Sequence, residues 1–272
     1  GCVSMRPRAI HTLFPKGRYK ALTFSYDDGR EEDRRLVSIF RKHGLKATFN
    51  LNSGEAETDP RRIPMDEWKD LYDGFEIASH TVTHPPIDRC PLSLVAEEIL
   101  EDRKAIEKIT GYPVRGFAYP FGSYTSEILS LLPSLGIRYG RIVGNSDGFA
   151  IPGDFYRWKA TCHHSHRLIE NGEAFLAIAN DYHLNLMYVW GHSFEFPRDD
   201  NWDVMERFAD MVSGRDDVWY ASNIEIADYI DASRRLIFSA DHSIVSNPSA
   251  MDVWLSIDGD PVMIPGGEVT SI

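Results

Sequence analysis

Strand-like and helix-like segments alternate along most of this chain, and the alternation restricts the fold more than any other feature. Strand-like runs rich in β-branched and aromatic residues cover residues 20–26, 47–51, 75–78, 114–119, 137–143, 184–190 and 218–220. Stretches with apolar residues at helical spacing cover residues 31–43, 65–72, 92–109, 126–132, 168–179, 202–211 and 224–233. Such steady β/α alternation predicts a parallel sheet with right-handed crossovers.

About seven strand–helix units of this kind could close into a barrel. The β/α alternation stops near residue 234, and short β-prone runs on both sides of a turn at Asp258-Gly259 follow it. No linker rich in Ser, Pro or Gly precedes this tail. The sequence therefore predicts a β/α domain over residues 1–233, which could close into a barrel, and a β-rich C-terminal appendage over residues 234–272 that packs on it.

Composition excludes several classes of function. The 29 basic and 41 acidic residues give a formal net charge of −12, which argues against a nucleic-acid-binding surface and favours a neutral or cationic partner such as an amino sugar. No run approaches the roughly 18 apolar residues of a membrane span. Without an apolar signal region at the N-terminus, a cytoplasmic location is expected rather than secretion or lipid anchoring. Cys2, Cys90 and Cys162 are too scattered for a disulfide framework and are expected to be ordinary thiols.

Two short stretches carry candidate chemistry. The first expected strand ends in Asp27-Asp28-Gly29, and neighbouring side chains on an extended backbone point to opposite sides, so one carboxylate could hold a metal while the other faces a substrate. His80 and His84 follow another expected strand at a spacing that lets both rings bind one ion. Two histidines and one carboxylate form a hydrolytic metal set with open positions. A solvated Asp-Gly turn and two surface histidines are the alternatives.

These residues resemble the polysaccharide deacetylase family, the NodB-homology or family 4 carbohydrate esterases. Residues 25–29, Ser-Tyr-Asp-Asp-Gly, are similar to the family's first motif, Thr-Phe-Asp-Asp-Gly, and residues 80–84 are similar to its His-x-x-x-His motif. The resemblance implies an irregular (β/α)7 barrel with Asp27 as the catalytic base. It also implies that Asp28, His80 and His84 hold one divalent metal ion. Zinc is expected, and Co²⁺, Ni²⁺, Mn²⁺ or Fe²⁺ also suit this ligand set.

Residues 117–122, Phe-Ala-Tyr-Pro-Phe-Gly, lie where the family carries its third motif, often Phe-Arg-Pro-Pro-Tyr-Gly. By this position Phe121 supplies a backbone N–H for the oxyanion. The chain departs from the pattern at Ala118, where many relatives have the Arg that orients the base. Arg157 stands where the fourth motif commonly has Asp, so its guanidinium is expected to pair with Asp27. A surface Arg beside Trp158 is the alternative.

Residues 186–192 end in Trp190-Gly191-His192 and resemble the fifth motif, which typically reads Leu-x-His. The resemblance implies that His192 is the general acid and that Trp190 walls the acetyl pocket. Tyr119 and Trp158 are expected to contact the substrate as well.

A histidine-rich loop at residues 162–166, Cys-His-His-Ser-His, does not belong to any of these motifs. Adjacent side chains diverge, and no carboxylate stands at a spacing that would complete a metal site, so a cleft lining or a plain polar loop is expected. Structural or surface roles are expected for the remaining candidates, which are Glu195, His11, His43, His183 and His242.

The motifs together predict a metal-dependent hydrolase that removes N- or O-acetyl groups from a polysaccharide or oligosaccharide. Hydrolysis of a small cyclic amide or ureide at the same site is one alternative, because aromatic walls also suit a planar heterocycle. A non-catalytic carbohydrate-binding relative is the other. The motifs do not distinguish among substrates, because groove loops set specificity and the fold does not.

Overall fold

The computed structural model describes residues 8–272, so the prediction for Cys2 lies outside the described residues. Cys90 and Cys162 are free thiols. The strands of the main sheet are β2 (Lys20–Asp27), β3 (Ala47–Leu51), β4 (Glu76–Ser79), β5 (Gly116–Ala118), β6 (Tyr139–Arg141), β7 (Cys162–His163), β8 (Asn185–Gly191) and β9 (Val218–Tyr220). The helices are α1 (Asp33–His43), α2 (Ser53–Thr58), α3 (Trp68–Leu71), α4 (Leu92–Thr110), α5 (Ser126–Leu131), α6 (Leu168–Leu176), α7 (Glu195–Asp199), α8 (Trp202–Val212) and α9 (Asn223–Arg234).

The main sheet is parallel and has the strand order β6-β5-β4-β3-β2-β8-β7. β9 pairs with β2 at residues 20–22, beside the β2–β3 pairing at residues 24–27. The curl of the sheet is completed by the residues before β7. Trp158 forms a parallel bridge with Arg141 of β6 and donates its N–H to the Gly140 carbonyl at 2.9 Å. The seven strands from β2 to β8 thus form the (β/α)7-type barrel implied by the motifs.

Successive side chains of β2 point alternately to the two faces of the sheet. Phe24 and Tyr26 lie in the apolar layer beneath α1 and α8. Ser25 and Asp27 point to the opposite face, toward the other strands of the barrel. β2 is buried along its whole length, which explains why its sequence reads as a nearly continuous apolar run until the two carboxylates.

The strands outside the barrel are β1 (Ile10–Leu13), β10 (Ile237–Phe238), β11 (Ile244–Ser246), β12 (Val253–Ile257), β13 (Asp260–Ile264) and β14 (Val269–Ser271). They form two three-stranded sheets, β1-β12-β13 and β10-β11-β14. The sequence did not predict β1, and its pairing with β12 joins the N-terminal segment to the C-terminal strands. The division at residues 233 and 234 stays a prediction.

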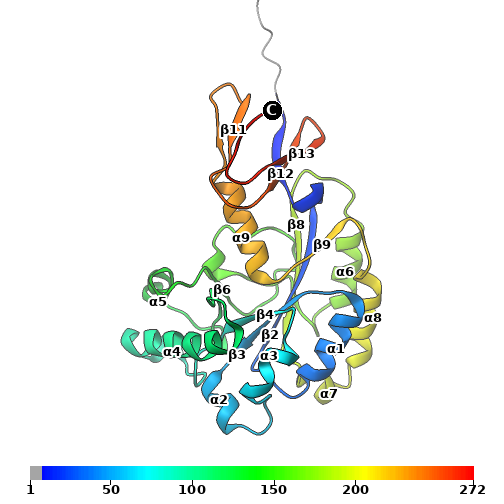
Figure 1. The fold of residues 1–272 in the computed structure, drawn as a ribbon. Coiled ribbons are helices and arrows are strands. Elements are labelled where there is room, and N and C mark those ends of the chain that lie inside the picture. The colour runs from blue at the N-terminus through cyan, green and yellow to red at the C-terminus, as the bar shows by residue number, and fades with distance from the viewer. Residues whose placement is uncertain (1–7) are drawn as a thin grey trace, which may run out of the picture.

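The small sheets and the chemical motifs lie at opposite ends of the molecule. In Figure 1 the small sheets lie above the barrel, and α2 and α7, which follow the C-terminal ends of β3 and β8, lie at its lower end. Among the described residues, no helix combines the length and apolar character needed to cross a membrane.

Candidate active site

The predicted site residues meet at the C-terminal ends of three strands of the main sheet, β4, β2 and β8. Asp27 is the last residue of β2 and Asp28 follows it, His80 follows β4, and His192 follows β8. Parallel strands of a barrel present their C-terminal ends on one face, so residues far apart in sequence share this rim. The sequence motifs therefore converge as the β/α pattern predicts.

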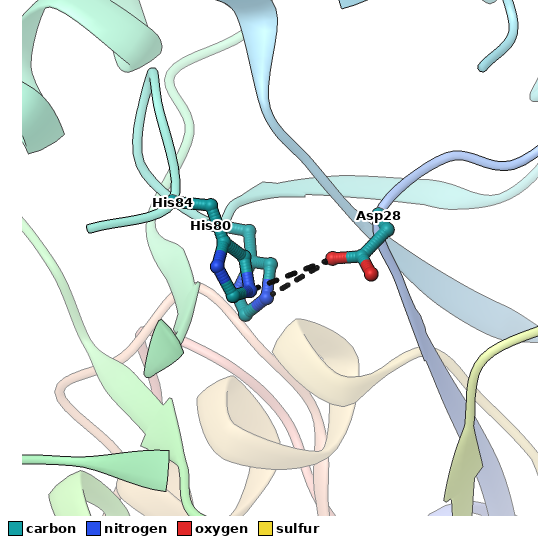
Figure 2. A group of neighbouring side chains, drawn as sticks. All are labelled: Asp28, His80 and His84. Atoms are coloured by element: carbon teal, nitrogen blue, oxygen red, sulfur yellow. Dashed lines mark ion pairs between the residues drawn. The ribbon is translucent and has the colours of Figure 1, made fainter. Parts of the chain in front are cut away.

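Asp28, His80 and His84 form a compact cluster. Nε2 of His80 lies 3.4 Å from Oδ1 of Asp28, and Nε2 of His84 lies 3.7 Å from the same oxygen. Figure 2 shows both imidazole rings with a nitrogen directed toward that oxygen. One donor atom from each residue lies within 4.8 Å of the others, an arrangement that could hold a single metal ion.

The donor set fits a divalent cation on three further observations. Nδ1 of His80 is 2.7 Å from the Ala118 carbonyl oxygen, which can only accept, so this nitrogen carries the proton and Nε2 keeps its lone pair. Oδ1 of Asp28 is buried without a hydrogen-bond partner in the described structure. Burial would raise the pKa of Asp28, but His80, His192 and His84 hold it well below its usual range, so the carboxylate is ionised.

The backbone between the two histidines has an unusual conformation. Thr81 and His84 have φ values of 73° and 59°, a left-handed region that non-glycine residues seldom adopt. Glu98 of α4 holds this loop: one of its carboxylate oxygens accepts the backbone N–H groups of Val82 at 2.8 Å and Thr83 at 2.9 Å. The strain is therefore offset by hydrogen bonds from a neighbouring helix.

Two buried carboxyl groups anchor the backbone on either side of the cluster. Asp102, one turn after Glu98, accepts the hydroxyl of Ser79, the residue before His80, at 2.5 Å. Asp33 accepts the hydroxyl of Ser193, the residue after His192, at 2.6 Å. The site is thus built on fixed backbone.

Asp27 is almost fully buried, and different partners hold its two oxygens. Oδ1 accepts a side-chain N–H of Asn50 at 2.9 Å, and Oδ2 pairs with the guanidinium of Arg141. Burial would raise the pKa of Asp27, but Arg141, followed by His80 and His192, lowers it below its usual value. Asp27 is therefore ionised at neutral pH.

The predicted contact between Arg157 and Asp27 is wrong. Arg157 is more than half exposed, and its Nε donates to Asp154 at 3.0 Å. Arg141, at the end of β6, supplies the guanidinium instead. The signal available in the sequence was a charged residue inside an expected buried strand, which is rare unless the charge is paired. Arg115, which also lies in an expected strand, forms a bidentate pair with Asp228 and does not contact Asp27.

His192 lies across from Asp27 and is held from behind by Glu195. Nε2 of His192 is 3.9 Å from an oxygen of Asp27 and of Asp28. Nδ1 of His192 is 3.2 Å from Oε1 of Glu195, which also accepts the backbone N–H of His192 at 2.6 Å. The sequence predicted only a structural or surface role for Glu195 and did not predict this contact. The spacing of three residues between His192 and Glu195 could have indicated it, because side chains at that spacing are neighbours on a helical turn.

The histidine-rich loop also meets a carboxylate, contrary to the expectation. His163, His164 and Glu195 form a second group whose donor atoms lie within 4.8 Å of one another. The barrel brings Glu195, which is 32 residues away from His163 in the chain, to this loop.

Two predicted substrate contacts are wrong. Tyr119 and Trp158 are each only 1% exposed. The Tyr119 hydroxyl donates to the Tyr156 carbonyl at 2.6 Å, and the Trp158 ring packs against Tyr139 and Tyr188 in the core. Neither side chain is available to a substrate.

Phe121 and Trp190 lie beside the cluster. Phe121 is 64% exposed, has a φ of 60°, and its ring packs edge-on against His84 at a centroid distance of 4.6 Å. Trp190 is partly exposed, with the Arg141 guanidinium 4.6 Å from its ring centroid. The predicted roles of both residues stay predictions.

Carboxylates and histidines thus meet at the C-terminal rim of the barrel strands, where barrels of this kind place their active sites. Residues 15–140 match the family model of the polysaccharide deacetylases. This segment, a little under half of the chain, is therefore similar to the polysaccharide deacetylases, as the motifs indicated.

Curated relatives match over less than half of this chain. A chitooligosaccharide deacetylase of a Bradyrhizobium strain is 25% identical over 121 residues, 43% of this chain and 53% of that protein. A chitooligosaccharide deacetylase of Rhizobium leguminosarum bv. phaseoli is 30% identical over 115 residues, 40% of this chain and 48% of that protein. The chain thus spans about half the length of these relatives.

Two solved structures share the fold over most of the chain. A Mycobacterium smegmatis protein assigned to the polysaccharide deacetylases has a TM-score of 0.61 at 19% identity and covers 81% of this chain and 93% of its own. A family 4 carbohydrate esterase pseudoenzyme of Bacillus anthracis has a TM-score of 0.51 at 17% identity, covering 79% of this chain and 67% of its own. These similarities show the fold.

Proposed function

We propose that this protein is a metal-dependent hydrolase that removes N- or O-acetyl groups from a polysaccharide or oligosaccharide. One observation carries the proposal: the ionised, Arg141-paired Asp27 lies between the Asp28, His80 and His84 cluster and the His192 imidazole. A base, a cation-binding group and an acid thus surround one small volume, as metal-assisted hydrolysis requires.

Each residue then has a chemical role. A divalent cation, with zinc expected first, would be held by Asp28, His80 and His84 and would supply Lewis-acid polarisation of the acetyl carbonyl and of water. Asp27 takes the proton of the attacking water, and Arg141 keeps the carboxylate ionised and fixed. His192 gives a proton from Nε2 to the leaving nitrogen or oxygen. The Phe121 backbone N–H stabilises the oxyanion, and Trp190 bounds the acetyl group.

Carbohydrate is the favoured substrate class on two grounds. The relatives with the same family region include chitooligosaccharide deacetylases. The acidic chain, with a formal net charge of −12, suits a neutral or amino sugar and does not suit an anionic polymer.

Metal content and acetate release test the proposal together. Purified protein is expected to hold one divalent ion per chain and to release acetate from at least one of chitooligosaccharides, acetylated xylan or peptidoglycan fragments. His84→Gln should lose the stoichiometric ion, whereas Asp27→Asn should keep it and lose about 10²- to 10⁴-fold in turnover, because an amide cannot accept the proton of water. The exposed Asp216→Asn serves as the control.

Other results would select another function. Hydrolysis of a cyclic amide or ureide without acetate release would replace the carbohydrate with a small heterocycle. Inactivity of the metal-loaded protein on every substrate would favour a non-catalytic carbohydrate-binding relative. The Bacillus anthracis protein with a similar fold is described as a pseudoenzyme.

A further inference from the structure

Three histidine rings surround Glu195, and their contacts differ in length. Nε2 of His163 lies 2.9 Å from Oε1 and 3.1 Å from Oε2 of Glu195. Nδ1 of His192 is 3.2 Å from Oε1, and Nε2 of His164 is 3.7 Å from it. Such a group could hold a second metal ion if the ring nitrogens that face Glu195 carry lone pairs. It could instead hold the Glu195 carboxylate if those nitrogens carry protons. The partner of the other nitrogen of each ring shows which of the two nitrogens is protonated.

The backbone of Ser165 fixes the proton of His163. Its N–H is 3.0 Å from Nδ1 of His163, and because an N–H only donates, Nδ1 must accept. The neutral ring therefore carries its proton on Nε2, which donates to Glu195. The Asn145 side chain accepts the backbone N–H of His163 at 2.7 Å, so the residue is held at both its backbone and its ring.

Nε2 of His164 faces Glu195 at 3.7 Å, beyond hydrogen-bonding distance, and is buried without a hydrogen-bond partner in the described structure. The buried hydroxyl of Tyr26 is 3.1 Å from Nδ1 of His164, and burial keeps its pKa well above the usual value, so the hydroxyl keeps its proton. Nδ1 is the one hydrogen-bond partner of this hydroxyl among the described residues, so the buried O–H is satisfied only if it donates to Nδ1. The neutral ring then carries its own proton on Nε2. A metal ion needs lone pairs at these positions, so the group is arranged to bind the Glu195 carboxylate and not a second metal.

We propose that His163 is a positioning residue for the general acid. Its Nε2–H holds the Glu195 carboxylate against Nδ1 of His192, which directs Nε2 of His192 toward the reacting atoms. Arg198 lies 3.8 Å from Oε2 of Glu195 and is 57% exposed. Without His163, only the contacts with His192 would oppose a turn of the carboxylate toward this guanidinium and solvent. The proposal rests on the proposed function, in which His192 is the general acid.

Imidazole ¹⁵N NMR of the zinc-loaded protein tests the arrangement without any substrate. At a pH where the rings are neutral, His163 should be protonated at Nε2 and His192 at Nδ1. His163→Leu should abolish the single tautomer of His192, whereas His163→Gln should keep it, because an amide N–H can still donate to Glu195. His166→Gln is the matched control, because His166 lies on the same loop but pairs with Asp147 at 3.0 Å.

Kinetics then measure the consequence. His163→Leu is expected to lower kcat by about 10- to 100-fold with little change in KM, and His163→Gln is expected to recover most of the loss. An unprotonated Nε2 on wild-type His163, an unchanged His192 tautomer in His163→Leu, or equal losses in both variants would overturn the proposal. A second equivalent of zinc that disappears in His163→Leu would also overturn it. If no substrate releases acetate, the proposed function fails, and the NMR result still decides the role of His163.

Discussion

At the scale of single residues, the buried pair of Asp27 and Arg141 governs the candidate base. The guanidinium stacks on the Trp190 ring and donates Nε–H to the Ser25 hydroxyl at 3.0 Å, which leaves its outer edge for Asp27. Burying two charges is costly, and the cost is offset only when the geometry satisfies both partners. Arg141 therefore fixes the rotamer of Asp27 as well as its charge.

Arg141→Lys is expected to lower turnover by about 10- to 100-fold, because a lysine keeps the charge but lacks the planar fork that contacts Asp27 and Ser25 together. Arg157→Lys is the matched control, because Arg157 pairs with Asp154 away from the site. Steady-state acetate release, with thermal unfolding to confirm folding, measures both. Equal activity of the two variants would remove Arg141 from the catalytic arrangement.

At the scale of elements, α4 supports the loop that carries His80 and His84. Glu98 and Asp102 lie one helical turn apart, so their side chains project from the same face of α4. Glu98 accepts two loop N–H groups and the Thr83 hydroxyl, and Asp102 accepts groups from the ends of β4 and the start of α2. The helix thereby holds the backbone from which His80 and His84 project.

Glu98→Gln should weaken metal binding by about 10-fold or more, because a glutamine oxygen can replace only one of the two accepting carboxylate oxygens. Its amide group would face the loop N–H groups or the Thr83 hydroxyl as a second donor. Competition with a chromophoric chelator measures the metal affinity, and Glu101→Gln, an exposed change on the same helix, is the control. An unchanged affinity would mean that the loop holds its conformation without α4.

At the scale of the whole molecule, three buried carboxyl groups couple the fold to pH. Burial raises the pKa of Asp33, Glu76 and Asp102 to about 7 in each case, despite the hydrogen bonds that each accepts. Between the usual pKa near 4 and this value, the folded state binds more protons than the unfolded state. The free energy of unfolding therefore falls as the pH rises from about 4 to about 7, by at most about 1.4 kcal/mol per pH unit for each group.

Glu76→Gln should remove one of these contributions. Glutamine resembles the protonated acid: its oxygen can accept the Thr48 hydroxyl and the Ile224 N–H, and its amide N–H can donate to the Tyr139 hydroxyl. Urea unfolding at pH 5 and pH 8 should show a smaller loss of stability in Glu76→Gln than in the wild type. The exposed Glu97→Gln is the control, and a wild-type slope in Glu76→Gln would mean that Glu76 does not titrate in this range.

The sequence predicted the β/α alternation because the information for it is local and repeated, and the family resemblance of the motifs implied the barrel. Strand periodicity, helical spacing and caps such as Gly44 depend on residues within a few positions of one another. The short strands β1 and β7 were missed, because four and two residues give too little pattern and their existence depends on distant partners. β1 forms only where β12, more than 230 residues later, offers an edge.

The sequence by itself determined the β/α alternation and the residues of the Asp27-Asp28 and His80–His84 motifs, because each motif is short and lies at the end of a strand. Only the tertiary structure decided their partners. Arg141 is 114 residues from Asp27, and Glu195 is 32 residues from His163. The tertiary structure also decided that Trp158 and Tyr119 lie in the core. Which side chains meet across a closed barrel depends on strand register and loop path, and these are set by packing of the whole chain and not by local spacing.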